Sequence, residues 1–184
     1  EGETPLLRLV EQLRGDGDLS KVPNLVYKQD GEVKVNRPFA KEELNALPTP
    51  DFDGLPLDLY LSPERVLPVM GSRGCYWEQC AFCSIPFDHM TFHVRYAENV
   101  VNDFKTLQEK YNCNNFFFTD EALPINFLRT FAAKIIEQKV DVQWTGELKF
   151  EKSLLKDDRM DLLYKSGCRK LIFGLESYNQ RVLD

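Results

Sequence analysis

The sequence predicts an α/β fold built on a parallel sheet, and two observations support that prediction. After Pro68, short apolar runs alternate with segments of helical spacing. Strands that alternate with helices of this length form crossover units, and crossover units form a parallel sheet. The chain has 184 residues, of which 43% are hydrophobic, so it is long enough to bury a core between such layers.

The first 64 residues are expected to form a linker module that precedes the sheet. Apolar side chains recur at helical spacing over 4–13, behind a Thr4-Pro5 start that is typical of a helix cap and first turn. An Asp-Gly dipeptide between 24–29 and 32–36 suits the tight turn of a β-hairpin. The prolines between 37 and 68 interrupt regular structure, which indicates a connector.

Residues 65–184 are expected to hold the sheet, as four strands and the helices between them. The strands are short apolar runs, and the helices carry apolar side chains on one face. The expected strands are 66–70, 115–119, 140–144 and 170–173, and the expected helices are 99–111, 125–138 and 154–165. In parallel α/β architectures the carboxyl ends of the strands carry the active site. Residues with chemistry should therefore follow the strands.

A glycine-entered loop with three cysteines follows the first of these strands. Cys75, Cys80 and Cys83 have C-x4-C-x2-C spacing, so one flexible loop can wrap three thiolates around a metal or cluster. A structural zinc site usually closes with four ligands, whereas three cysteines leave one iron of a cluster free to bind a substrate. The sequence therefore predicts an iron–sulfur cluster in this loop.

Other interpretations of the cysteines stay open at this point. The same spacing followed by a distant fourth cysteine is typical of plant-type ferredoxins, and Cys113 would be that ligand in a non-catalytic electron-transfer protein. Against this, Cys113 precedes a buried strand and is expected at the end of that strand opposite the cysteine loop. Zinc, plain buried thiols and a scaffold that folds without binding a cluster are the remaining alternatives.

Carboxylates follow the second, third and fourth expected strands. Asp120 and Glu121 follow the second strand, Glu147 the third and Glu176 the fourth. Because the carboxyl ends of parallel strands meet at one edge of a sheet, these acceptors would form a ring able to bind amines and sugar hydroxyls. For Asp120 the alternative role is capping of the helix that begins at Ile125.

The order of these motifs resembles radical S-adenosylmethionine enzymes. It combines the cysteine loop, the Thr-Asp-Glu step at 119–121 and the Phe-Gly-Leu-Glu-Ser step at 173–177. The chain resembles in particular the subgroup with an upstream cobalamin-binding domain, in which a Gly-Cys-Tyr-Trp loop with one extra residue replaces C-x3-C-x2-C. The resemblance implies that 65–184 is the N-terminal part of a partial parallel (β/α) barrel. It makes 1–64 the tail end of an upstream domain that this chain lacks.

The resemblance also implies cofactors and a role for each candidate residue. The three cysteines would bind a [4Fe-4S] cluster, whose open iron would chelate S-adenosylmethionine and whose electron would cleave it to a 5'-deoxyadenosyl radical. Phe82 would pack near the adenine, and Glu121 or Asp120 would accept from the methionyl ammonium. Glu147 and Glu176 would face the ribose. A flavodoxin-type or ferredoxin-type electron donor is implied as a partner, and cobalamin would be held by a domain outside this chain.

The residues around the loop have less specific expectations. The aromatic residues Tyr76, Trp77 and Phe87 would shield the cluster from water and oxygen, with ordinary packing as the alternative. His89, His93 and Arg95 follow the loop, and we expect them at the surface, with contacts to substrate or cofactor as the alternative.

Composition limits the partners and the location. The formal charge is -6 with no run of basic residues, so nucleic acid is not an expected partner. No stretch approaches the ~18–20 apolar residues that a membrane span needs, and no signal pattern opens the chain, so a cytoplasmic location is expected. The chain starts without methionine, which suggests a piece of a longer protein. The substrate of that protein is unknown. Four strands leave one edge of the sheet open, and we expect another chain or a second copy in a dimer to cover it.

Overall fold

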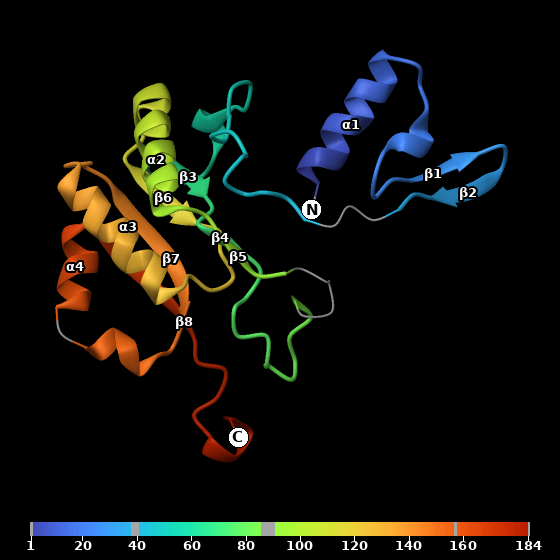
Figure 1. Cartoon of the computed structure of the whole chain (residues 1–184). Helices are drawn as coiled ribbons and strands as arrows, with labels where there is room; N and C mark the ends of the chain where they lie inside the picture. Colours follow the sequence, from blue (N-terminus) through green and yellow to red (C-terminus); the bar gives the residue numbers. More distant parts are fainter. Residues whose placement is uncertain (1, 38–40, 86–90, 157, 184) are drawn as a thin grey trace. The chain divides into compact units, whose positions relative to one another are not determined.

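A computed structural model describes residues 2–37, 41–85, 91–156 and 158–183 of the chain, which divides into two compact units (Figure 1). The first unit is Glu1–Glu43 and the second is Leu44–Asp184. The second unit thus begins earlier in the chain than residue 65, where the sequence pattern places the start of the sheet domain.

The first unit consists of a helix, a short 3-10 turn and a hairpin. These are α1 (Glu3–Arg14), η1 (Leu19–Lys21), β1 (Val26–Gln29) and β2 (Glu32–Val35), with the two strands antiparallel. The hairpin turns through Asp30 and Gly31, whose φ angles are 53° and 85°. Positive φ at both central residues is the geometry that favours Asp-Gly in two-residue hairpin turns. The predicted helix and hairpin are confirmed.

The predicted cap of α1 is wrong. The helix follows Gly2, which makes no side-chain cap. Thr4 lies inside the first turn, where its backbone N–H donates to Glu42 Oε1 at 2.6 Å and its hydroxyl donates to Glu42 Oε2 at 2.9 Å. A carboxylate from the far end of the unit therefore satisfies a first-turn donor that a local cap would otherwise satisfy.

The second unit is built on a four-stranded parallel sheet, which confirms the predicted α/β class. The strands are β3 (Val66–Val69), β6 (Asn115–Phe118), β7 (Gln143–Lys149) and β8 (Cys168–Gly174), and they lie in chain order. The helices α2 (Ala97–Tyr111), α3 (Ile125–Glu137) and α4 (Arg159–Lys165) connect them. Figure 1 shows the three helices side by side on one face of the sheet. Closure into a barrel stays a prediction.

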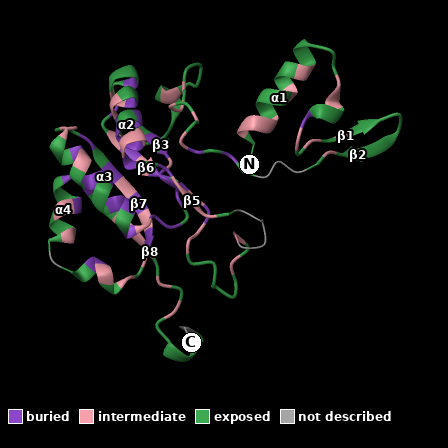
Figure 2. Cartoon of the chain, viewed as in Figure 1, coloured by how far each residue is buried: buried purple, intermediate pink, exposed green. Residues whose placement is uncertain are grey.

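The core lies between this face of the sheet and the helices, where Figure 2 shows buried residues on both layers. Leu67, Phe116 and Trp144 form one register row across three strands, and each is almost fully buried. Phe104 of α2 stacks on Phe116 with ring centroids 4.2 Å apart. Since side chains alternate along a strand, the neighbouring residues, such as Phe117, face the opposite side of the sheet.

Three elements differ from the sequence prediction. β7 runs from Gln143 to Lys149, later in the chain than the expected strand at 140–144. α4 begins at Arg159, because a 3-10 turn, η4 (Lys152–Leu155), occupies the start of the expected helix. A two-residue ladder between β4 (Ser72–Arg73) and β5 (His93–Val94) was not predicted at all.

Two further short helices complete the described elements. These are η2 (Leu57–Leu59) in the proline-rich connector and α5 (Gln180–Leu183) near the end of the chain. Within the part of the chain that the structure describes, no helix is both long enough and apolar enough to cross a bilayer.

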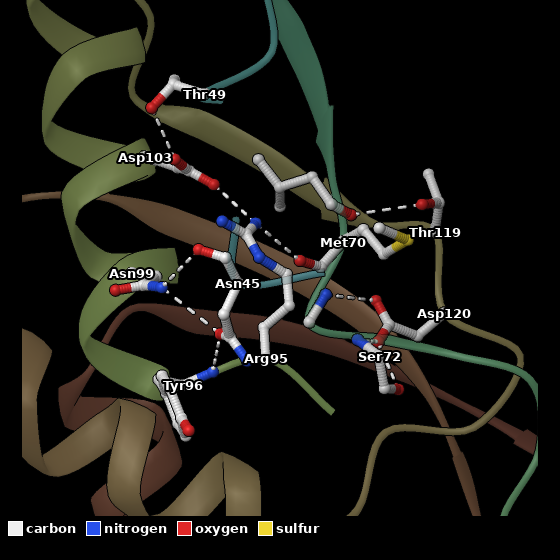
Figure 3. Close-up of polar contacts among 12 residues, drawn as sticks. Asn45, Thr49, Met70, Ser72, Arg95, Tyr96, Asn99, Asp103, Thr119 and Asp120 are labelled. Atoms are coloured by element: carbon white, nitrogen blue, oxygen red, sulfur yellow. Dashed lines mark hydrogen bonds and ion pairs between the residues drawn. The ribbon is translucent and has the colours of Figure 1, made fainter. Parts of the chain in front are cut away.

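The start of the second unit packs on α2 (Figure 3). Asn45 Oδ1 accepts from the backbone N–H of Tyr96 at 2.7 Å, and the Thr49 hydroxyl donates to Asp103 Oδ1 at 2.6 Å. These bonds join residues far apart in the chain. They are the physical reason why part of the connector belongs to the sheet unit.

Candidate functional site

The cysteine loop leaves and re-enters the fold at one point. β4 carries the chain into the loop and β5 carries it out, and the two strands pair antiparallel, with Ser72 opposite Val94. Gly74 follows the ladder with a φ of 79°, a backbone conformation that residues with a side chain rarely adopt. Both ends of the loop are therefore fixed beside the carboxyl end of β3.

Asp120 holds the entry to this loop (Figure 3). Its side chain is buried, Oδ2 accepts from the N–H of Gly71 at 3.0 Å, and Oδ1 accepts from the N–H and, at 2.6 Å, the hydroxyl of Ser72. Burial raises the pKa of Asp120 to about 6, although these hydrogen bonds act in the opposite direction. The capping alternative is wrong, because α3 follows Pro124 and has no side-chain cap.

Arg95 holds the exit, and the expectation that it lies at the surface is wrong. It is 6% exposed and forms an ion pair with Asp103 of α2, with Nη1 2.6 Å from Oδ2. Nη1 also donates to the carbonyl of Met70 at 3.2 Å, and the backbone N–H donates to the carbonyl of Gly71 at 2.8 Å. Pairing and hydrogen bonding offset the cost of burying the two charges. The backbone at 70–72 is thus held from one side by Arg95 and from the other by Asp120.

The three cysteines are free thiols in a partly exposed loop. Cys75 and Cys83 are half-buried and Cys80 is exposed, and the N–H of Cys83 donates to the carbonyl of Cys80 at 3.1 Å. Desolvation raises the pKa of the Cys80 thiol, and the negative charges of Cys83, Cys75 and Glu176 raise it further, while Lys149 lowers it. The Cys80 thiol therefore lies within electrostatic range of these four groups.

The potential ligands in the cysteine loop are free thiols. Among the described residues, no three His, Cys, Asp or Glu side chains converge closely enough to hold one metal ion. A cluster places its ligands farther apart than a single ion does, because each thiolate binds a different iron atom. Cys75, Cys80 and Cys83 are free thiols on one loop whose two ends are paired, which is the donor set that a three-cysteine cluster would use. Phe87 and His89 lie outside the described residues.

The loop is anchored to the carboxyl end of β7 by Tyr76 and Trp77. The Tyr76 hydroxyl donates to Glu151 Oε1 at 2.5 Å, and Lys149 Nζ lies 3.6 Å from the centroid of the Trp77 ring. Burial of the Tyr76 hydroxyl, followed by its bond to Glu151, raises the pKa of Tyr76. No motif in the sequence singles out Lys149 or Glu151. The signal that could have found Lys149 is its place in the alternating pattern of β7, two residues beyond Glu147.

Of the remaining predicted site residues, Glu121 and Glu176 follow their strands as expected and Glu147 does not. Glu121 is exposed just after β6, and Glu176 is exposed just after β8 with a φ of 59°. Glu147 lies inside β7, because that strand continues to Lys149. It is half-buried and shares a face of the sheet with Lys149. Phe82, in the loop, is 71% exposed.

Cys113 cannot complete the cysteine site. Its Sγ donates to the carbonyls of Arg65 and Asn115, at 3.1 and 3.3 Å, just before β6 begins. β3 and β6 are parallel, with Val66 opposite Asn115, so Cys113 lies at the amino end of the sheet and the cysteine loop at the carboxyl end. Burial raises the pKa of the Cys113 thiol. The alternative in which Cys113 is the fourth ligand of a ferredoxin-type site is therefore wrong.

In enzymes built on parallel α/β sheets the active site lies at the carboxyl ends of the strands, which is where this chain has its cysteine loop, Glu121 and Glu176. Comparison with known proteins gives the same class, because the relatives are named as enzymes, mainly methyltransferases. No family model matches the chain.

Three of these relatives match over the whole chain. An uncharacterized methyltransferase of Pyrococcus horikoshii is 28% identical, with 40% of its own length covered. The cytidylyl-2-hydroxyethylphosphonate methyltransferase of Streptomyces wedmorensis is 24% identical, with 40% covered. The anaerobic magnesium-protoporphyrin IX monomethyl ester cyclase of Synechocystis is 20% identical, with 37% covered. The chain thus spans about 40% of the length of these relatives.

Proposed function

We propose that the chain is part of a radical S-adenosylmethionine enzyme that transfers a methyl group. The observation that carries this proposal is a loop with three free thiols, Cys75, Cys80 and Cys83, that leaves the parallel sheet at the carboxyl end of β3. The buried bonds at the base of the loop support it, since a cofactor site needs its ligands on a fixed frame.

In this proposal Cys75, Cys80 and Cys83 hold a [4Fe-4S] cluster. When bound, the cluster would supply the electron that cleaves S-adenosylmethionine to a 5'-deoxyadenosyl radical. The protein would contribute the fixed frame of the loop and the carboxylates that orient the substrate. A flavodoxin-type or ferredoxin-type protein would be the electron donor.

The carboxylates divide into two roles. Glu121 is favoured over Asp120 as the acceptor for the methionyl ammonium, because the oxygens of Asp120 already accept three hydrogen bonds from Gly71 and Ser72. Glu147 and Glu176 would accept from the ribose hydroxyls. Phe82, whose ring is largely exposed, would pack on the adenine.

Methyl transfer is the reaction that the names of the relatives favour. Besides the two methyltransferases that match over the whole chain, a bacteriochlorophyllide d C-12(1)-methyltransferase of Chlorobaculum tepidum is 25% identical over 65% of the chain. Cobalamin, held by a domain outside this chain, would then be a carrier of the methyl group. We also propose a reducing, cytoplasmic setting, since all five cysteines are free thiols. The edge of the sheet would be covered by further strands or by a second copy.

Turnover of S-adenosylmethionine tests this function. The reduced, anaerobically reconstituted full-length protein should release 5'-deoxyadenosine or transfer the methyl group. Glu121→Gln should raise KM for S-adenosylmethionine by about 10-fold or more, because a hydrogen bond to a charged group contributes about 1.5–3 kcal/mol. Glu109→Gln, at an exposed position on α2, is the matched control. If the unaltered protein forms neither 5'-deoxyadenosine nor a methylated product, the proposed function is wrong.

A further inference from the structure

Two contacts tie the cysteine loop to residues that the proposed function leaves unused. Both start from the aromatic pair directly after Cys75, and both end at the carboxyl end of β7. Tyr76 donates a hydrogen bond of 2.5 Å to Glu151, and the ammonium of Lys149 lies 3.6 Å from the Trp77 ring centroid. A cation at this distance from an indole ring is attracted by the negative face of the ring.

The two anchors differ in what they add to the loop. The Tyr76 bond is directional and fixes the ring beside the first cysteine, and the same ring also contacts Phe92 at a centroid distance of 5.7 Å. Lys149 adds a full positive charge to a region where negative charge collects, since Glu147 shares its face of the sheet and Glu176 follows the neighbouring strand. Because the Lys149 ammonium is attracted to the Trp77 ring, the position of its charge is fixed relative to the loop.

We propose that Lys149 and Glu151 are positioning residues for the cysteine loop, and that Lys149 also supplies the cation that balances the negative charge of the cluster. This inference rests on the proposed function for its second part only. The first part concerns protein contacts that exist without a cofactor. Removing the charge of Lys149 should make the cluster harder to reduce, because an added electron would no longer be stabilised by a nearby cation.

The reduction potential of the cluster tests the charge. The full-length protein is reconstituted as the unaltered form and as Lys149→Met, Lys149→Arg and Lys152→Met, and each is titrated anaerobically with detection by electron paramagnetic resonance. We expect a more negative potential in Lys149→Met and recovery in Lys149→Arg. Lys152→Met is the control, because Lys152 is exposed, lies close by in the chain and carries the same charge. Equal potentials in all four proteins would overturn the charge-balancing role of Lys149.

The fluorescence of Trp77 tests the anchor without any cluster. Trp144 is fully buried, so acrylamide should quench mainly the emission of Trp77 in the protein without iron. Quenching should increase in Lys149→Met and stay unchanged in Lys152→Met, and a Trp77→Phe variant identifies the signal. Unchanged quenching in Lys149→Met would overturn the anchoring role. If the unaltered protein takes up no iron, the charge-balancing role falls with the proposed function, and the quenching result still decides the anchoring role.

Discussion

Two buried carboxylates, Asp120 and Asp103, control the backbone where β3 becomes the cysteine loop. Asp120 accepts from the backbone directly, whereas Asp103 acts through Arg95, which donates to the carbonyls of Met70 and Gly71. The sequence pattern indicates neither of these two backbone contacts.

The stability of the protein should depend on the ionisation of Asp120. Its pKa of about 6 in the folded state lies above the ordinary value of 3.8, so the folded state holds this proton more tightly than the unfolded state. The stability that it contributes is complete below pH 3.8 and is lost as the pH rises through 6. Between pH 5 and pH 7.5 the free energy of unfolding should fall by about 1 kcal/mol more than in Asp120→Asn. Urea unfolding at both pH values measures this difference, and equal changes in the two proteins would argue against it.

Asp103→Ala should destabilise the second unit strongly. It leaves the Arg95 guanidinium buried without its carboxylate, and breaking a buried pair in this way costs about 3–5 kcal/mol. Glu109→Ala, on the exposed face of the same helix, should stay within about 0.5 kcal/mol of the unaltered protein. The free energy of unfolding in urea separates the two, and similar values for both would contradict the role of the pair.

At the scale of elements, β7 connects the core to the site. Trp144 and Leu148 point into the core, while Glu147 and Lys149 occupy the opposite face. β7 enters the sheet beside Gly167, which ends the turn between α4 and β8 with a φ of 94°. A change at this turn should therefore also disturb β7, the strand that anchors the cysteine loop.

Gly167→Ala should be among the most damaging small substitutions in the chain. A Cβ at this position would lie 1.9 Å from the carbonyl oxygen of Val142, in addition to the strained φ. We expect a loss of about 3 kcal/mol or more. Gly54→Ala is the matched control, because Gly54 also has a positive φ, 84°, but a Cβ there meets open space, which leaves a cost of about 1–2 kcal/mol. Thermal unfolding of both variants tests the comparison, and equal losses would count against a backbone clash at Gly167.

The elements predicted well are those that bury one complete face. In α2, for example, Val100, Phe104 and Leu107 are all fully buried, as their helical spacing predicts. β7 was misplaced because Gly146 looks like a loop residue. The structure gives another reason for this glycine, since a Cβ there would lie 2.5 Å from Leu123 Cδ1. The burial of Arg95 was not predictable, because its partner is fixed by packing and not by a local pattern.

At the scale of the whole molecule, the second unit brings together what the sequence separates. A single edge of the parallel sheet receives the cysteine loop, Glu121 after β6 and Glu176 after β8. The placement of these groups at one edge of the sheet was predictable from the alternation of strands and helices. Their support was not, because the bonds from Asp120, Arg95 and Glu151 join segments that are distant in sequence.

Iron and sulfide content after anaerobic reconstitution tests the central claim, that Cys75, Cys80 and Cys83 hold a cluster. The unaltered full-length protein should bind about four iron and four sulfide per cysteine loop, with the spectrum of a [4Fe-4S] centre. Cys80→Ser should lose most of this content, and Cys113→Ser should retain it, since Cys113 lies at the other end of the sheet. A two-iron centre that disappears in Cys113→Ser, or full iron content in Cys80→Ser, would contradict the claim.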